Sequence, residues 1–191
     1  MNAKELKRIK SSIVTTKDLI TRTIPITLSE EICESINCYA YALGIMWYND
    51  FVNFQPGFTG KSIDNQFDSN FKLNDSETFM QEICSDLQNL GISYRQIELD
   101  GKKSLAEGEY LIKVFCTKPY VCGLIGDFHF VRYDNCTGIW FHKVGWYMQP
   151  EVVSDRSYDK VKWKYSEPDE FYDYSACTKL EPLGYFAIKE K

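Results

Sequence analysis

The sequence predicts a single α+β domain of 191 residues, with helices in its first half and an antiparallel sheet in its second. Apolar residues recur at helical spacing across residues 76–90, and Gly91 ends that run. The period then changes to two, and strand-like runs follow at 92–99, 109–117, 127–133, 139–144 and 183–188. Because no repeat or linker interrupts the chain, we expect one domain, 1–191, with helices on a sheet of about five strands.

The first seventy or so residues predict a peripheral arm and one important helix. Residues 1–22 are expected to form the arm, in which residues 1–20 look like a polar and marginal helix. A helix-start signal at Ser29 leads toward Asn37, and the helix that carries Cys38 is expected to run to about Tyr48. The segment 61–73 is expected to be a polar loop.

Late in the chain, residues 147–178 are acidic, rich in tyrosine and irregular in pattern. We expect a long loop there, and long loops inside compact domains are more often functional than idle.

Composition and charge exclude several classes of protein. The net charge of −5 argues against a nucleic-acid partner, and no segment is long and apolar enough for a membrane span or a signal peptide. The seven cysteines form no CxxC pair and have no zinc-ligand spacing, so we expect no metal and no cofactor. The sequence therefore predicts a reduced, cytoplasmic protein without a membrane or nucleic-acid partner.

Cys38 is the first candidate for chemistry. Asn37 precedes it and is able to cap the helix that follows, so Cys38 should lie at a helix N-terminus. Free N–H groups at that position favour a thiolate, depress the thiol pKa and are able to hold an oxyanion. The alternative is that Cys38 is a small buried core residue, as free cysteines commonly are.

The only two histidines, His129 and His142, fall on the two arms of one predicted hairpin. Nucleophilic thiol chemistry needs a base near the sulfur and a third group that orients the base. A loop of four residues, 135–138, would place both rings on one face of the sheet, where we expect them to turn toward Cys38. A loop of five residues would place them on opposite faces.

Three segments resemble papain-like cysteine peptidases of the NlpC type, and specifically a little-described bacterial and phage group. The segments are NCYAYAL at 37–43, DFHFVR at 127–132 and GIWFHKVG at 138–145, against the group patterns NCYxYAL, DxHxYR and GxWxHKxG. A closing GYF at 184–186 is also similar. Val131 and Val144 depart from the aromatic residue and the proline usual in the group. The resemblance implies a papain-like fold.

The resemblance also implies a Cys-His-His triad. Cys38 resembles the nucleophile, His129 the general base and His142 the residue that orients the base. Lys143 is expected to be a solvated strand residue, and Asp127 either binds a substrate amine or caps its strand. The candidate substrate contacts are Asn37, Asp127, Trp140 and Trp146.

We therefore expect a cysteine hydrolase, a peptidase or amidase that acts on a peptide or amide substrate through a thioester. The same scaffold also serves acyltransferases and deamidases, because the acyl group can pass to water or to an amine. A non-catalytic papain-like binding module is the second alternative.

Overall fold

The structure is a computed structural model that describes the placement of part of the chain. The described residues are 13–15, 28, 30–47, 55–60, 76–117, 127–134, 138–145, 148–153, 171–173 and 178–189. The expected loop at 61–73 lies outside them, as do Trp146 and most of the arm at 1–22.

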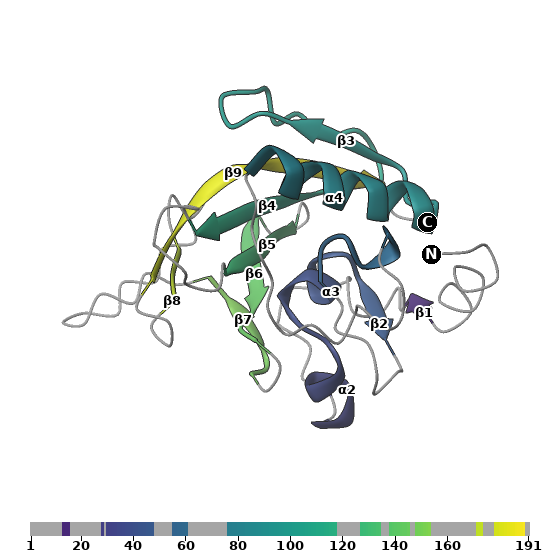
Figure 1. Ribbon diagram of the computed structural model, residues 1–191, viewed down its shortest axis with the longest axis vertical. Helices are drawn as coiled ribbons and strands as arrows, with labels where there is room; N and C mark the ends of the chain where they lie inside the picture. The colour runs from purple at the N-terminus through teal and green to yellow at the C-terminus, as the bar shows by residue number, and fades with distance from the viewer. Residues whose placement is uncertain are drawn as a thin grey trace.

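The described chain contains three α-helices, one 3-10 turn and nine strands (Figure 1). The helices are α2 (Glu30–Ser35), α3 (Cys38–Ala42) and α4 (Ser76–Leu90), and the 3-10 turn η2 covers Phe58–Gly60. The strands are β1 (Ile13–Thr15), β2 (Ile45–Trp47), β3 (Tyr94–Ile97), β4 (Glu109–Thr117), β5 (Phe128–Asp134), β6 (Ile139–Lys143), β7 (Pro150–Val152), β8 (Phe171–Asp173) and β9 (Thr178–Lys189).

The main sheet is antiparallel, so the α+β class is confirmed. Its order is β3-β9-β4-β5-β6-β7, with β8 paired to β9, which makes seven strands among the described residues rather than the expected five or so. The two extra strands, β7 and β8, lie inside the segment 147–178 that we expected to be irregular. They are three residues each, too short to leave an alternating pattern in the sequence.

The closing strand is longer than predicted and central. β9 begins at Thr178 and pairs with β3 on one side and β4 on the other. Pro182 and Gly184 hid this length in the sequence, since both residues usually weaken a strand. The pairing of β4 with β9 shifts register between Val114 and Phe115, and this irregularity accommodates them.

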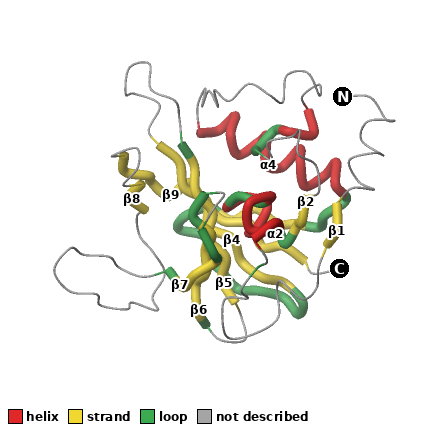
Figure 2. The backbone as a smooth tube through the Cα atoms, turned by 90° about the horizontal axis from the view of Figure 1, so that it is seen from below, coloured by secondary structure: helices red, strands yellow, loops and turns green. Residues whose placement is uncertain are grey.

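A second, smaller sheet joins the N-terminal region to the chain after α3. β1 pairs with β2 in antiparallel fashion, and Figure 2 shows the two strands side by side. The prediction of a helix in the arm is therefore wrong at residues 13–15.

The cysteine-bearing helix is much shorter than predicted. α3 ends at Ala42 instead of near Tyr48, because Gly44 adopts a φ of 64° and the chain then enters β2. A residue with positive φ just after a helix is a common stop signal, and glycine adopts it without strain. The run Ile45-Met46-Trp47 also favours a strand.

The main sheet separates two cores, because successive side chains of a strand point to opposite faces. The helical face carries Val114, Phe130 and Phe186 and packs against α3 and α4. In Figure 1 the sheet curves around α3 while α4 lies beside β3 and β9. The other face, which we call the histidine face, packs Phe115 and Val131 in a second cluster.

The predicted helix at 76–90 is confirmed as α4, and Gly91 follows it with a φ of 70°. Its apolar stripe packs into the helical-face core. Within the described residues, no helix has the length and apolar character that crossing a membrane would require.

Candidate functional site

Asn37 caps α3 as predicted, and this places Cys38 at the first helical position. The Ala40 amide donates a hydrogen bond of 3.0 Å to the Asn37 side-chain oxygen, and Asn37 itself has extended backbone. Asn37 is buried. The structure therefore gives Asn37 a capping role, and its contact with a substrate stays a prediction.

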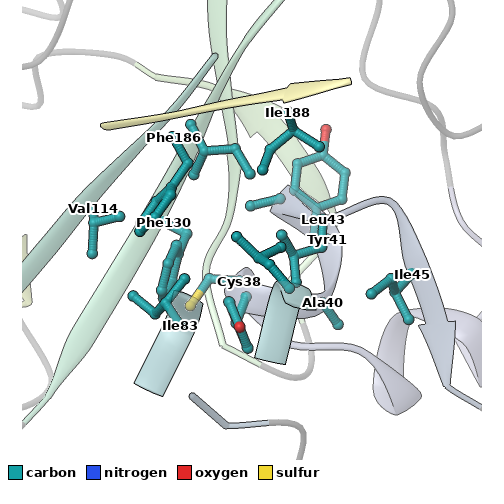
Figure 3. Close-up of a cluster of buried hydrophobic side chains, with 14 of the residues drawn as sticks. Cys38, Ala40, Tyr41, Leu43, Ile45, Ile83, Val114, Phe130, Phe186 and Ile188 are labelled. Carbon is teal, nitrogen blue, oxygen red and sulfur yellow. The ribbon is translucent and has the colours of Figure 1, made fainter. Parts of the chain in front are cut away.

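The Cys38 sulfur lies against the backbone of β5. The thiol points to the Phe128 carbonyl oxygen, with Sγ and O 3.9 Å apart. Cys38 is only 5% exposed and belongs to the helical-face core, where Figure 3 shows its sulfur on the Phe130 side. The alternative that we kept for this residue, a buried core cysteine, describes its packing correctly.

The expected depression of the Cys38 pKa is wrong for this structure. The pKa of the thiol is raised from 9.0 to about 12, mainly by burial and next by the negative charge of the nearby Asp127 carboxylate. The backbone amides of Phe130 and Tyr39 and the Lys143 ammonium lower it, but less. A helix of five residues supplies few aligned peptide dipoles, so desolvation outweighs the helix N-terminus.

The hairpin brings the two histidines together on one face, as the four-residue loop predicts, but this face is the one opposite to the core that contains Cys38, not the one expected to turn toward it. Asp134 pairs with Ile139, so residues 135–138 form the loop, and His142 lies directly opposite Val131. His129 is two residues before Val131 and therefore shares its face. His129 Nε2 and His142 Nδ1 are 2.9 Å apart, and the two buried rings are nearly perpendicular at 89°.

A carboxylate that the sequence did not single out continues this chain of side chains. Glu151 on β7 pairs with His142 across the sheet, and its Oε1 lies 3.4 Å from His142 Nε2. Glu151 sits within the segment 147–178, whose irregular pattern gave no register. The one signal in the sequence was that Glu151 follows Pro150, and proline is often the first residue of a strand.

The relation of the sulfur to the rings follows from alternation along β5. Phe128 and Phe130 project to the helical face, whereas His129 between them projects to the histidine face. The structure brings the sulfur to the backbone on either side of His129.

Lys143 is buried, so the expectation of a solvated side chain is wrong. Its exposure is 0%, and its ammonium donates a hydrogen bond of 2.7 Å to the Gly145 carbonyl. Burial lowers the Lys143 pKa, and the nearby Cys33 and Cys38 thiols raise it. The strand turns Lys143 to the helical face because His142 takes the other.

Two of the other residues predicted to contact a substrate, Asp127 and Trp140, make contacts within the protein itself. The Asp127 carboxylate accepts a hydrogen bond of 2.8 Å from the Phe128 amide, which fits the capping alternative. Trp140 is buried in the histidine-face core, 5.1 Å from the Tyr133 ring between centroids. Trp146 lies outside the described residues. Contact of Asp127, Trp140 or Trp146 with a substrate stays a prediction.

A buried carboxylate that the sequence analysis missed supports the start of α3. Asp86 on α4 accepts hydrogen bonds from the Tyr39 hydroxyl at 3.1 Å, the Gly57 amide at 2.7 Å, and the Thr59 amide at 3.0 Å. The Thr59 hydroxyl donates a fourth. Asp86 thereby ties together α4, η2 and the residue next to Cys38. Its place on the apolar stripe of α4, three residues after Ile83, was the available signal.

In the described part of the chain, no group of three or more His, Cys, Asp or Glu side chains is arranged to hold a metal ion. No protein-family model, curated protein or solved structure matches this sequence.

Proposed function

We propose that this protein is a cysteine hydrolase of the papain-like type, acting on a peptide or amide through a thioester. Cys38 is the nucleophile, His129 the base and His142 the residue that orients the base. The observation that carries the proposal is the 2.9 Å contact between His129 Nε2 and His142 Nδ1, on the hairpin whose first strand touches the Cys38 sulfur.

The order of the parts supports a papain-like fold. A cysteine begins a helix that packs on an antiparallel sheet, a histidine follows on β5, and a polar residue follows on the neighbouring β6. This is the order of nucleophile, base and orienting residue that the motif resemblance implies. α3 packs against both β5 and β6, and these contacts support the proposal because the three residues belong to these elements.

In the reaction, the Cys38 sulfur attacks the carbonyl carbon while its proton passes to His129 Nδ1. The C–N bond then breaks, and His129 returns the proton to the leaving amine. Water attacks the thioester, the acid product leaves, and Cys38 recovers its proton. The Cys38 backbone amide is the candidate donor to the oxyanion.

The raised thiol pKa fixes how this reaction starts. A thiol with a pKa of about 12 is neutral at pH 7, so no preformed thiolate is available. His129 must take the proton during the attack, as a general base does, and the sulfur must reach the ring around the edge of β5. The Phe128 carbonyl, the present partner of the thiol, would lose that contact.

A reducing compartment, and hence the cytoplasm, is part of the proposal. The described cysteines Cys33, Cys38, Cys84 and Cys116 are all free thiols, which suits such a compartment.

The second candidate function is a non-catalytic binding module on the same scaffold. Its support is specific: Cys38 is 5% exposed, and burial raises its pKa to about 12. A scaffold that only grips a partner needs no reactive sulfur.

Acylation by p-nitrophenyl acetate separates the two candidates without knowledge of the substrate. The hydrolase should form an acetyl thioester on Cys38, found by mass spectrometry of peptides, and His129→Ala should slow it strongly. Cys116 is the internal control, because burial raises its pKa to about 12 as well. Equal labelling of Cys38 and Cys116, unaffected by His129→Ala, would contradict the hydrolase.

A further inference from the structure

We propose that Glu151 is a positioning residue that sets which nitrogen of each histidine carries the proton. The inference rests on the proposed function, because it concerns the base of the same reaction. It extends the predicted triad by a fourth group, on a strand that the sequence did not predict.

The strand register of the sheet itself brings Glu151 and His142 into contact. The two residues are directly paired between β7 and β6, and directly paired residues point to the same face. Oε1 lies 3.4 Å from Nε2 while His142 is almost fully buried and Glu151 is one third exposed. Glu151 thus reaches a buried ring from the rim of the histidine face.

The proton positions follow from what each group is able to donate. An ionised carboxylate only accepts hydrogen bonds, so the proton of neutral His142 must be on Nε2. His142 Nδ1 is then a lone pair and accepts the Nε2 proton of His129 across 2.9 Å. His129 is left with its lone pair on Nδ1, the state that a general base needs.

The opposite arrangement shows why the carboxylate matters. If His142 carried its proton on Nδ1, it would donate to His129 Nε2, and the proton of His129 would move to Nδ1. That nitrogen would no longer accept a proton from the thiol. A second function follows from charge, because the carboxylate stabilises the positive charge that the ring pair gains when His129 takes the proton.

A purely structural cross-strand pair is the competing explanation for Glu151. It would stabilise the edge of the sheet without fixing a proton position. The two explanations differ in a spectroscopic signature, and the sequence favours the measurement: with two histidines in the chain, a histidine-labelled sample contains only two imidazole rings.

The experiment is a long-range ¹H–¹⁵N spectrum of ¹⁵N-histidine protein, recorded without substrate where both rings are neutral. The proposal expects both rings protonated at Nε2 and an exchange-protected Nε2 proton signal from His142. Glu151→Ala should remove that protected signal, whereas Glu151→Gln, which keeps an acceptor oxygen, should retain it. Glu181→Gln, a change to a partly buried glutamate on β9, is the matched control and should alter neither ring.

A wild-type His142 protonated at Nδ1 would overturn the proposal, even if Glu151→Ala failed to fold. A protected His142 signal that survives in folded Glu151→Ala would overturn it too. Acetylation of Cys38 by p-nitrophenyl acetate should slow about tenfold in Glu151→Ala and recover only in part in Glu151→Gln, because the amide keeps the acceptor oxygen but not the negative charge. The spectrum needs no reactive cysteine, so failure of the hydrolase proposal and failure of this one are distinguishable.

Discussion

Asp86 should make the stability of this protein fall as the pH rises through the weakly acidic range. Burial raises the pKa of its carboxyl group from 3.8 to about 6, although the hydrogen bonds from Thr59, Gly57 and Tyr39 oppose the shift. The native state therefore holds a proton that the unfolded state has already released between these two pH values. Stability is greatest below pH 3.8 as far as this group is concerned, and it declines until the pH exceeds about 6.

The expected size of the effect comes from the same interval. From 3.8 to about 6, at about 1.4 kcal/mol per pK unit, the free energy of unfolding should fall by about 3 kcal/mol. Asp86→Asn removes the titration, so the stability of the variant relative to wild type should rise by about that amount across the interval. At low pH the Asp86→Asn variant should be the less stable protein, because the new amide NH₂ meets at least one of the donors whose hydrogen bonds Asp86 accepts.

Urea denaturation at several pH values from below 3.8 to above 6 measures this difference. Asp100→Asn is the control, because Asp100 is exposed. The same neutralisation there should leave the difference from wild type constant. A difference between wild type and Asp86→Asn that does not change with pH would refute the reasoning, since the carboxyl group would then titrate alike in both states.

Three further expectations concern the surroundings of Cys38. Tyr39→Phe removes the hydrogen bond to Asp86 without changing the ring, and it should lower the free energy of unfolding by about 1–2 kcal/mol in urea denaturation. Alkylation of Cys38 by iodoacetamide, followed by mass spectrometry, should still accelerate about tenfold per pH unit well above pH 9.0, because the thiol pKa is raised from 9.0 to about 12; a rate that levels off within about one pH unit above 9.0, or lower, would show an ordinary or depressed pKa. Lys143→Met removes the ammonium that lowers the Cys38 pKa, so it should slow this alkylation, and an unchanged rate would assign the cation a structural role.

The sequence predicted the elements whose pattern is local and strong. The apolar spacing of α4, the glycine after it, and the strand-like runs of β4, β5 and β6 all matched the structure within a residue or two. Hairpin parity also predicted correctly that His129 and His142 share a face, because that question depends only on the number of residues in the loop.

What the sequence missed depends on contacts between distant parts of the chain. Burial of Lys143 and Asp86 comes from the packing of other elements on β6 and α4, and a single charged residue in a strand or helix does not indicate it. The pKa of Cys38 was predicted from the helix N-terminus alone, whereas desolvation, which requires the whole fold, outweighs that effect. Glu151 was missed for the same reason, since its register with His142 exists only in the assembled sheet.

The positions of the buried polar side chains Lys143, Asp86 and His129 favour a functional interpretation over a purely structural one. Burying a charge or a polar ring is expensive, and apolar side chains of similar size often stabilise a core at least as well. Yet the Lys143 ammonium interacts electrostatically with Cys38, and Asp86 accepts a hydrogen bond from Tyr39, the residue after Cys38. His129 lies between Phe128 and Phe130, whose backbone groups contact the Cys38 sulfur. Other charged side chains, such as Lys113 and Arg132, are buried elsewhere in the sheet. The buried groups that adjoin Cys38 on α3 and on the β5–β6 hairpin are the ones that a reaction at this sulfur would require.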